Sequence, residues 1–221
     1  SLVGSEMCIR DRLYIAPVIL NHVKPNGVGK KIIGQVHSFS KSYETMLVSY
    51  AESGIFVNSN EKSLFVKAKF GLRRFSLYYH IFKLVKKEHF DFVYIRYHLA
   101  DPLYALLLLI LKMKGSKIVI EIPTYPYATS FEKKLSSFFK LSIDRISYPL
   151  LHFSIGRIVT YSNDDEIFGI ETIKTLNGID FNNEKIVTKT FDENNQTISL
   201  ISVSMTYACH GYDRVIRGLS N

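Results

Sequence analysis

The sequence predicts an α/β fold: a Rossmann-like parallel sheet with helices on both faces, followed by an incomplete second α/β domain. Two segments indicate the sheet, because residues 93–97 and 117–120 are short apolar runs rich in β-branched side chains. Residues 101–114, between them, have the length and apolar content of a buried helix. Strand, helix and strand in this order form a βαβ unit, in which the strands run parallel and the helix covers one face.

Composition indicates a globular chain with a basic surface. The 221 residues are 47% hydrophobic, which supplies a sizeable core, and the net charge is +8. This charge favours nucleic acid, phosphate-bearing ligands or an acidic membrane surface, and an ordinary basic surface is the alternative. No nucleic-acid recognition motif with interleaved aromatic residues is present, so no nucleic-acid partner is expected. Cys8 and Cys209 lie near opposite ends of the chain, and neither has a second cysteine close in sequence, which favours a reducing, cytoplasmic setting without a zinc site or disulfide framework.

The first residues are expected to be a leader foreign to the fold. Residues 1–12 show neither helical nor strand periodicity, and they resemble a translated sequencing adaptor. The first strand is predicted at 13–16. A helix follows after a loop, because apolar residues recur at helical spacing from Val28 to Phe39.

Gly27, Gly29 and Lys30 lie where this helix is predicted to start. Two glycines allow close approach of the backbone, and the N–H groups of a helix N-terminus favour an anion. Lys30 and Lys31 add positive charge, so this loop is a candidate phosphate site. A Rossmann dinucleotide loop would need a third glycine where Ile32 stands, which excludes that class. The alternative is a glycine-softened turn with solvated lysines.

A hairpin and an amphipathic helix are predicted before the βαβ unit. Residues 43–51 form the second strand, and apolar runs at 55–57 and 64–66 flank a polar loop, which is typical of a hairpin. The helix at 72–87 is apolar around most of its circumference and carries a narrow basic stripe. Such a helix is either buried in a core or lies in a membrane interface, and burial is the commoner case.

Beyond the βαβ unit, the first domain is predicted to continue to residue 185. A polar stretch at 186–196 is the expected linker, and 197–221 is expected to supply the first strand and helix of a truncated second domain. The other predicted elements are helices at 131–141 and 147–153, strands at 157–162 and 173–176, and an Asn-Gly turn at 177–180.

Polar residues follow both strands of the βαβ unit. They are Arg96, His98 and Asp101 after the first strand, and Glu121, Thr124, Tyr125 and Tyr127 after the second. Ligands of parallel sheets bind beyond the carboxyl ends of the strands, so this edge is the predicted functional site.

Six motifs occur in a fixed order along the chain. They are the stretch from Gly27 to Gln35, Tyr94-Ile95-Arg96, the Glu-Ile-Pro-Thr-Tyr-Pro-Tyr stretch at 121–127, Tyr161-Ser162, Asn177-Gly178-Ile179-Asp180 and His210-Gly211-Tyr212-Asp213. Together they resemble the bacterial glycosyltransferase family 4 group of the GT-B fold, in particular members that act in surface polysaccharide synthesis. The resemblance covers residues 13–221.

The resemblance implies two Rossmann-like domains with the active site in the cleft between them. The N-terminal domain of this family holds a saccharide or lipid-linked acceptor, and the C-terminal domain holds most of the nucleotide-sugar donor. The chain looks like the acceptor domain plus the start of the donor domain, so the fragment alone is expected to be inactive. The family transfers sugars with retention of configuration and without a metal, and no further cofactor is implied.

The resemblance also assigns roles. Glu121 and His98 become candidate catalytic residues. The acceptor-binding candidates are Arg96, Asp101, Thr124, Tyr125 and Tyr127. The donor-phosphate candidates are Gly27, Gly29, Lys30, His210 and Gly211. No metal site is expected.

Structural alternatives stay open for most of these side chains. Glu121 either accepts a hydrogen bond from the acceptor hydroxyl or pairs with Arg96 to stabilise the fold. His98 is a general base or a strand-capping residue. Tyr125 and Tyr127 offer ring faces to a sugar or pack the loop around its prolines. For the whole chain, the alternative function is a non-catalytic basic module on an anionic membrane surface, and the two combine in an enzyme peripheral to the inner membrane face.

Overall fold

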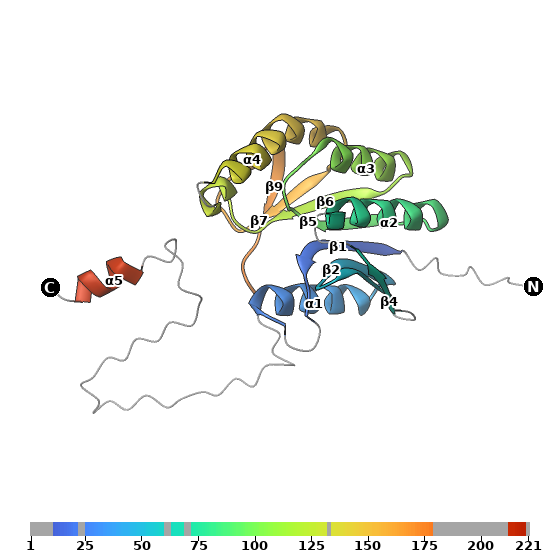
Figure 1. Ribbon diagram of the computed structural model, residues 1–221, viewed down its shortest axis with the longest axis horizontal. Coiled ribbons are helices and arrows are strands. Elements are labelled where there is room, and N and C mark those ends of the chain that lie inside the picture. The colour runs from blue at the N-terminus through green and yellow to red at the C-terminus, as the bar shows by residue number, and fades with distance from the viewer. Residues whose placement is uncertain are drawn as a thin grey trace, which may run out of the picture. The chain divides into compact units, whose positions relative to one another are not determined.

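The computed structural model describes residues 11–21, 25–59, 63–68, 72–131, 134–178 and 212–219 (Figure 1). The chain divides into two compact units, residues 1–178 and 179–221. In the second unit, helix α5 (Tyr212–Leu219) is described. The predicted linker at 186–196 and the strand expected after it lie outside the described residues.

The first unit is built on one open, mostly parallel sheet. Its nine strands lie in the order β4-β3-β2-β1-β5-β6-β7-β9-β8. Strands β2, β1, β5, β6, β7 and β9 run parallel, whereas β3, β4 and β8 are antiparallel to their neighbours. The bounds are β1 (Arg12–Ile19), β2 (Thr45–Ala51), β3 (Gly54–Asn58), β4 (Ser63–Lys67), β5 (Phe92–Arg96), β6 (Lys117–Ile122), β7 (Arg157–Thr160), β8 (Glu166–Ile167) and β9 (Ile170–Lys174). The predicted α/β class is confirmed.

The helices cover both faces of this sheet, as predicted. Helix α1 (Gly27–Ser40) lies on one face, and α2 (Arg73–Lys87), α3 (Pro102–Met113) and α4 (Leu135–Ser147) lie on the other (Figure 1). A 3₁₀ helix, η3 (Tyr148–Phe153), follows α4 directly. A second 3₁₀ segment, η2 (Tyr127–Ser130), lies in the loop after β6.

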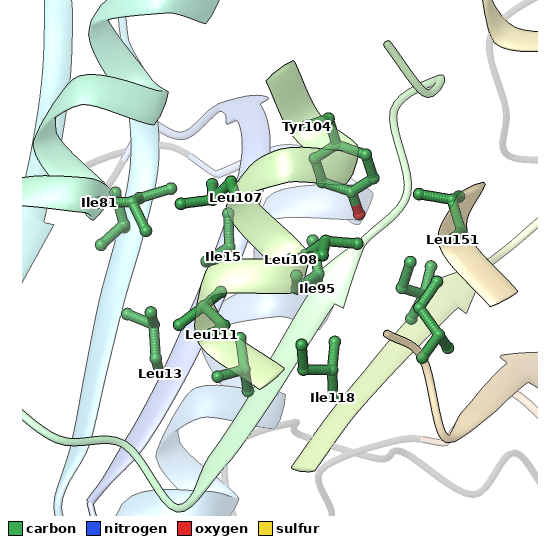
Figure 2. Packing of buried hydrophobic residues seen from close by; sticks show 14 of the residues in the cluster. Leu13, Ile15, Ile81, Ile95, Tyr104, Leu107, Leu108, Leu111, Ile118 and Leu151 are labelled. Carbon is green, nitrogen blue, oxygen red and sulfur yellow. The ribbon is translucent and has the colours of Figure 1, made fainter. Parts of the chain in front are cut away.

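The two faces hold two separate hydrophobic cores. The larger core lies under α2 and α3, where Leu108 and Leu111 are fully buried against Ile95 and Ile118 of the sheet (Figure 2). Burial of each such leucine contributes about 1.5–3 kcal/mol. The smaller core lies under α1 and includes Ile32.

Local chemistry explains the βαβ unit at the centre. Asp101 caps α3 by accepting a hydrogen bond from the Tyr104 N–H at 2.8 Å, and Pro102 occupies the first helical turn, where its missing N–H costs nothing. Strands β5 and β6 pair in register from Phe92 with Lys117 to Arg96 with Glu121. The βαβ unit predicted from these residues is confirmed.

The predicted hairpin is also confirmed, with β3 and β4 at the edge of the sheet. Gly54 is required there, because a Cβ atom at this position would lie 2.0 Å from the carbonyl oxygen of Val66. Helix α2 is buried on one side only. Leu77 and Ile81 are in the core, whereas Phe75 and Tyr79 are exposed.

The segment after β6 differs from its prediction. The first helix was expected at 131–141, but Phe131 is extended and α4 begins at Leu135 and continues to Ser147. The second expected helix, at 147–153, is the 3₁₀ helix η3. Strand β8 was not predicted. A two-residue turn joins it to β9, and both turn residues, Phe168 and Gly169, have positive φ, as tight hairpin turns of type I′ require.

Candidate functional site

Four of the predicted site residues, Glu121, Arg96, Asp101 and Tyr127, lie at the carboxyl edge of β5 and β6, where they belong to three separate clusters. The Glu121 cluster lies on the α1 side of the sheet and consists of Glu121, Arg96, Lys31, Gln35, Tyr94 and Tyr14. The Arg74 cluster consists of Arg74, Tyr78 and Asp101 and lies between α2 and α3. The Asp144 cluster joins Asp144 of α4 to Tyr97 and Tyr127.

Glu121 is fully buried, and donors surround both of its carboxylate oxygens. Oε1 lies 2.9 Å from Nη1 of Arg96 and 3.2 Å from Nζ of Lys31. Oε2 accepts hydrogen bonds from the Tyr94 hydroxyl at 2.9 Å and from Nε2 of Gln35 at 3.1 Å. A buried carboxylate needs such partners, because an unpaired one costs several kcal/mol.

The partners of Glu121 come from two elements, β5 and α1. Arg96 ends β5, Tyr94 lies two residues before it on the same strand, and Lys31 and Gln35 lie four residues apart on one side of α1. The Tyr14 hydroxyl extends the network by donating to Oε1 of Gln35 at 2.6 Å. Burial, followed by the negative charge of Glu121, raises the pKa of both Tyr14 and Tyr94, so these hydroxyls act as hydrogen-bond donors.

This geometry favours the structural alternative for Glu121. Its carboxylate oxygens are occupied by four contacts with donors from α1 and β5. Its negative charge holds two cations, Arg96 and Lys31, at the carboxyl edge of the sheet. Arg96 is buried with it, whereas the side chain of Lys31 is 25% exposed. Lys31 Nζ also lies 3.6 Å from the ring centre of Tyr161 and 3.4 Å from Oδ1 of Asn177.

The glycine loop opens α1 as predicted. Asn26 is the N-cap, and its side chain accepts a hydrogen bond from the Gly29 N–H at 2.8 Å. Gly29 is buried, and a Cβ atom there would lie 3.2 Å from the Cβ of Pro25. Nothing lies within 4 Å of the Cβ position at Gly27. Lys30 is exposed, and its neighbour Lys31 is the lysine that reaches the sheet.

Both carboxylate oxygens of Asp101 also make structural contacts. Besides capping α3 through Oδ1, its Oδ2 lies 2.6 Å from Nε of Arg74 and accepts a hydrogen bond from the Tyr78 hydroxyl at 2.9 Å. Nη2 of Arg74 donates to the Leu99 carbonyl at 2.6 Å and so fixes Leu99, whose φ of 59° lies in the left-handed region. The Arg74 cluster therefore shapes the loop between β5 and α3.

His98 lies on this loop and keeps part of its surface exposed. Loss of hydration, followed by the positive charges of Arg74 and Lys140, lowers the pKa of its imidazole, which favours the neutral form at pH 7. His98 borders a cavity of about 10 Å³, which has room for one water molecule. Tyr104 lines the same cavity, and its buried hydroxyl has no hydrogen-bond partner among the described protein atoms.

Asp144 is a second buried carboxylate, which is not among the predicted site residues. It accepts hydrogen bonds from the hydroxyls of Tyr97 and Tyr127 and from the backbone N–H of Ala100. Burial and this carboxylate raise the pKa of both tyrosines. The signal in the sequence was an acidic residue alone in an otherwise apolar and basic helix.

Aromatic rings cluster beyond β6. Tyr125 and Tyr127 lie with ring centres 6.3 Å apart, and both approach Phe168, at 6.4 and 6.2 Å. Tyr148 stacks on Phe168 at 4.4 Å with an angle of 18° between the rings. Thr124 is exposed and Tyr125 is half-buried. The rings of Tyr125 and Tyr127 thus pack against Phe168, while Thr124 and part of Tyr125 stay accessible.

Three residues of the Glu121 cluster were missed as site residues: Gln35, Tyr94 and Tyr14. Lys31 was expected to add positive charge beside Lys30, and its contact with Glu121 was not predicted. The i, i+4 spacing of Lys31 and Gln35 was a usable signal, since both project from one side of α1. The predicted phosphate-binding residues His210 and Gly211 lie outside the described residues. In the part of the chain that the structure describes, no group of three or more His, Cys, Asp or Glu side chains is placed to hold a metal ion.

Neither a scan of the chain against protein-family models nor a search of curated proteins found a match. The motif resemblance to glycosyltransferases therefore remains a prediction that rests on the residues themselves.

Proposed function

We propose that this chain forms the acceptor-binding part of a glycosyltransferase, which moves a sugar from a nucleotide-sugar donor to a saccharide or lipid-linked acceptor. The observation that carries the proposal is the pair of cations, Arg96 and Lys31, held by the buried Glu121 at the carboxyl edge of a parallel sheet. Ligands of such sheets bind at this edge.

The charge balance of the cluster suits a phosphate-bearing ligand. Two cations and one carboxylate leave one net positive charge, and Glu121 fixes its position before any ligand arrives. In glycosyl transfer, the bond between the anomeric carbon and a diphosphate oxygen breaks, and the acceptor oxygen bonds to that carbon. Negative charge then grows on the diphosphate, and a fixed cation stabilises it. Lys31 is the partly exposed member that can meet a phosphate.

His98 is our candidate for the group that accepts the proton of the acceptor hydroxyl. A base must be neutral at the working pH and reachable, and His98 has a lowered pKa and an exposed surface. Glu121 serves in this proposal as a positioning residue for Arg96 and Lys31. Thr124 and Tyr125 supply a hydroxyl and a ring face to a sugar.

A transfer assay tests the proposal. The chain, and the same chain extended by whatever its reading frame encodes downstream, are incubated with a panel of radiolabelled nucleotide sugars and with saccharide and lipid-linked acceptors. We expect transfer with at least one pair, and a loss of about 10²–10⁴-fold in kcat for His98→Asn, as for removal of a general base.

Lys31→Met should weaken transfer, while Lys41→Met, an exposed lysine after the end of α1, should not. Far-UV circular dichroism checks that each variant is folded. Absence of transfer with every pair in both proteins, or full transfer in His98→Asn and Lys31→Met, would overturn the proposal.

A further inference from the structure

Helix α4 has its polarity inverted. Its inward side carries Asp144 and Ser147, which are both buried. Its outward side carries large apolar side chains, with exposed fractions of 73% at Leu135, 66% at Phe138 and 78% at Ile146. A surface helix of a globular domain normally shows the opposite arrangement, so the outward side of α4 needs an apolar partner.

The exposed apolar surface continues beyond α4. Leu150 and Phe153 of η3 are exposed, Phe153 by 73%. We call this surface the α4–η3 face, which consists of Leu135, Phe138, Phe139, Ile143, Ile146, Leu150 and Phe153. A groove of about 420 Å³ opens at its N-terminal end, lined by Leu135 and Phe138 together with Phe131 and Leu141.

The helices of this layer carry accessible charge of one sign. Helices α2, α3, α4 and η3 contain a single carboxylate, Asp144, which is buried. Their exposed charged residues are Lys83, Lys86, Lys87, Lys112, Lys140 and Arg145. Lys140 and Arg145 flank the apolar residues of α4 on the helix surface. An occupant of this face must therefore be apolar and also anionic.

We propose that the α4–η3 face docks on the surface of an anionic phospholipid bilayer. The apolar side chains enter the boundary between headgroups and acyl chains, and the flanking cations contact the lipid phosphates. None of the described helices is long and apolar enough to cross a bilayer, so the contact is interfacial. A second copy of the chain fits less well, because the basic flanks of two such faces would repel each other.

The α4–η3 face is not the element for which the sequence suggested membrane contact, which was the helix at 72–87. The helix at 72–87 buries Leu77, Ile81 and Val85 in the core, so a smaller part of it is available for lipid. Docking does not depend on the proposed glycosyl transfer, and its test uses no activity.

Vesicle co-sedimentation of the whole chain tests the docking. One set of vesicles contains phosphatidylcholine alone, and the other contains phosphatidylcholine with phosphatidylglycerol. We expect binding to the second set, weakened by added salt. Replacing Phe138, Phe139 and Ile146 by serine should lower the partition coefficient roughly tenfold for each side chain removed. The matched control replaces the exposed Leu64 of β4 and the exposed Leu176, which follows β9, and should bind like the wild type.

Charge variants separate the electrostatic part of the contact. Lys140→Gln and Arg145→Gln should each weaken binding to the anionic vesicles about fivefold, the loss expected for one cation near the surface. The control Lys41→Gln changes an exposed cation after α1, on the opposite face of the sheet, and should leave binding unchanged.

A fluorescent probe gives a second readout that needs no loss of apolar surface. The chain has no tryptophan, so Phe138→Trp introduces a single indole on the α4–η3 face. We expect its emission to shift to the blue with anionic vesicles, whereas Leu64→Trp should show no shift. Several results would overturn the proposal: no binding to anionic vesicles, equal binding by the serine variant, or no shift at Phe138→Trp. A wild-type dimer that the serine variant abolishes would instead assign the face to self-association.

Discussion

Arg96 and Glu121 lie opposite each other on neighbouring parallel strands, with Nη1 of Arg96 2.9 Å from Oε1 of Glu121 and both side chains buried. They are paired because β5 and β6 belong to one βαβ unit. Helix α3 connects the two strands so that they run parallel and end at the same edge of the sheet. The pair therefore links the fold to the site that we propose.

The first prediction concerns removal of the Glu121 charge. Glu121→Gln leaves Arg96 buried without its counter-ion, so the free energy of unfolding should fall by about 3–5 kcal/mol in urea titrations. The control is Glu171→Gln, which breaks an exposed ion pair with Arg157 and should cost less than about 1 kcal/mol. Equal losses in the two variants would contradict the assignment of Glu121 to a buried ion pair.

A double variant sharpens this comparison. Arg96→Met combined with Glu121→Gln removes the unpaired cation as well, so it should be more stable than Glu121→Gln alone. If instead the two losses add, Glu121 and Arg96 are not coupled in the folded protein.

The second prediction tests the Asp144 cluster. Tyr127→Phe removes one of the hydroxyls that donate to this buried carboxylate, and a hydrogen bond to a charged group contributes about 1.5–3 kcal/mol. We expect that loss in the free energy of unfolding. Tyr79→Phe, at an exposed tyrosine of α2, should stay within about 0.5 kcal/mol of the wild type. A loss at Tyr127 as small as that at Tyr79 would show that Asp144 does not depend on this donor.

Much of the fold could be predicted because the signals were local. The β-branched runs of β5 and β6, the glycine start of α1 and the hairpin before α2 each depend on neighbouring residues, and the structure has all of them. Strand β8 was missed because it has two residues, and because its turn places Phe168 at a positive φ that bulky residues rarely adopt.

The region of α4 was harder to predict because most of the large apolar residues of this helix face outward. Periodicity locates an apolar side of a helix but does not say whether that side meets a core or a partner. Asp144 was overlooked for a different reason: a lone acidic residue in a helix is usually exposed to solvent. The ion pair of Glu121 with Lys31 and its hydrogen bond with Gln35 could not be predicted either. Both partners are distant in sequence and contact Glu121 only once α1 packs on the sheet.

The third prediction separates the two glycines of the loop before α1. Gly27→Ala should be neutral or stabilise the protein by up to about 1 kcal/mol, because its Cβ meets nothing within 4 Å and alanine favours a helix. Gly29→Ala should be less stable than Gly27→Ala by about 1–3 kcal/mol, because its Cβ would crowd Pro25 and Asn26. Thermal unfolding of the two variants, side by side, measures the difference, and equal stability would contradict the close packing at Gly29.

The last prediction concerns alkaline pH. Burial, then the charge of Glu121, raises the pKa of Tyr14 and Tyr94, so these hydroxyls stay protonated in the folded protein after the unfolded chain has begun to ionise near pH 10. Their contribution to stability is complete below that pH and is lost as the pH rises above it. Each such tyrosine lowers the free energy of unfolding by about 1.4 kcal/mol per pH unit in that range.

Tyr14→Phe separates this ionisation from the hydrogen bond that Tyr14 donates to Gln35. The variant should be less stable than the wild type at neutral pH, because Gln35 loses its donor. Above pH 10 its stability should decline less steeply, because one fewer hydroxyl must be kept protonated on folding. Urea titrations at a series of pH values, followed by circular dichroism and tyrosinate absorbance, measure both effects. Parallel declines in the two proteins would mean that Tyr14 ionises as readily in the folded state as in the unfolded chain, which its burial against the Glu121 cluster opposes.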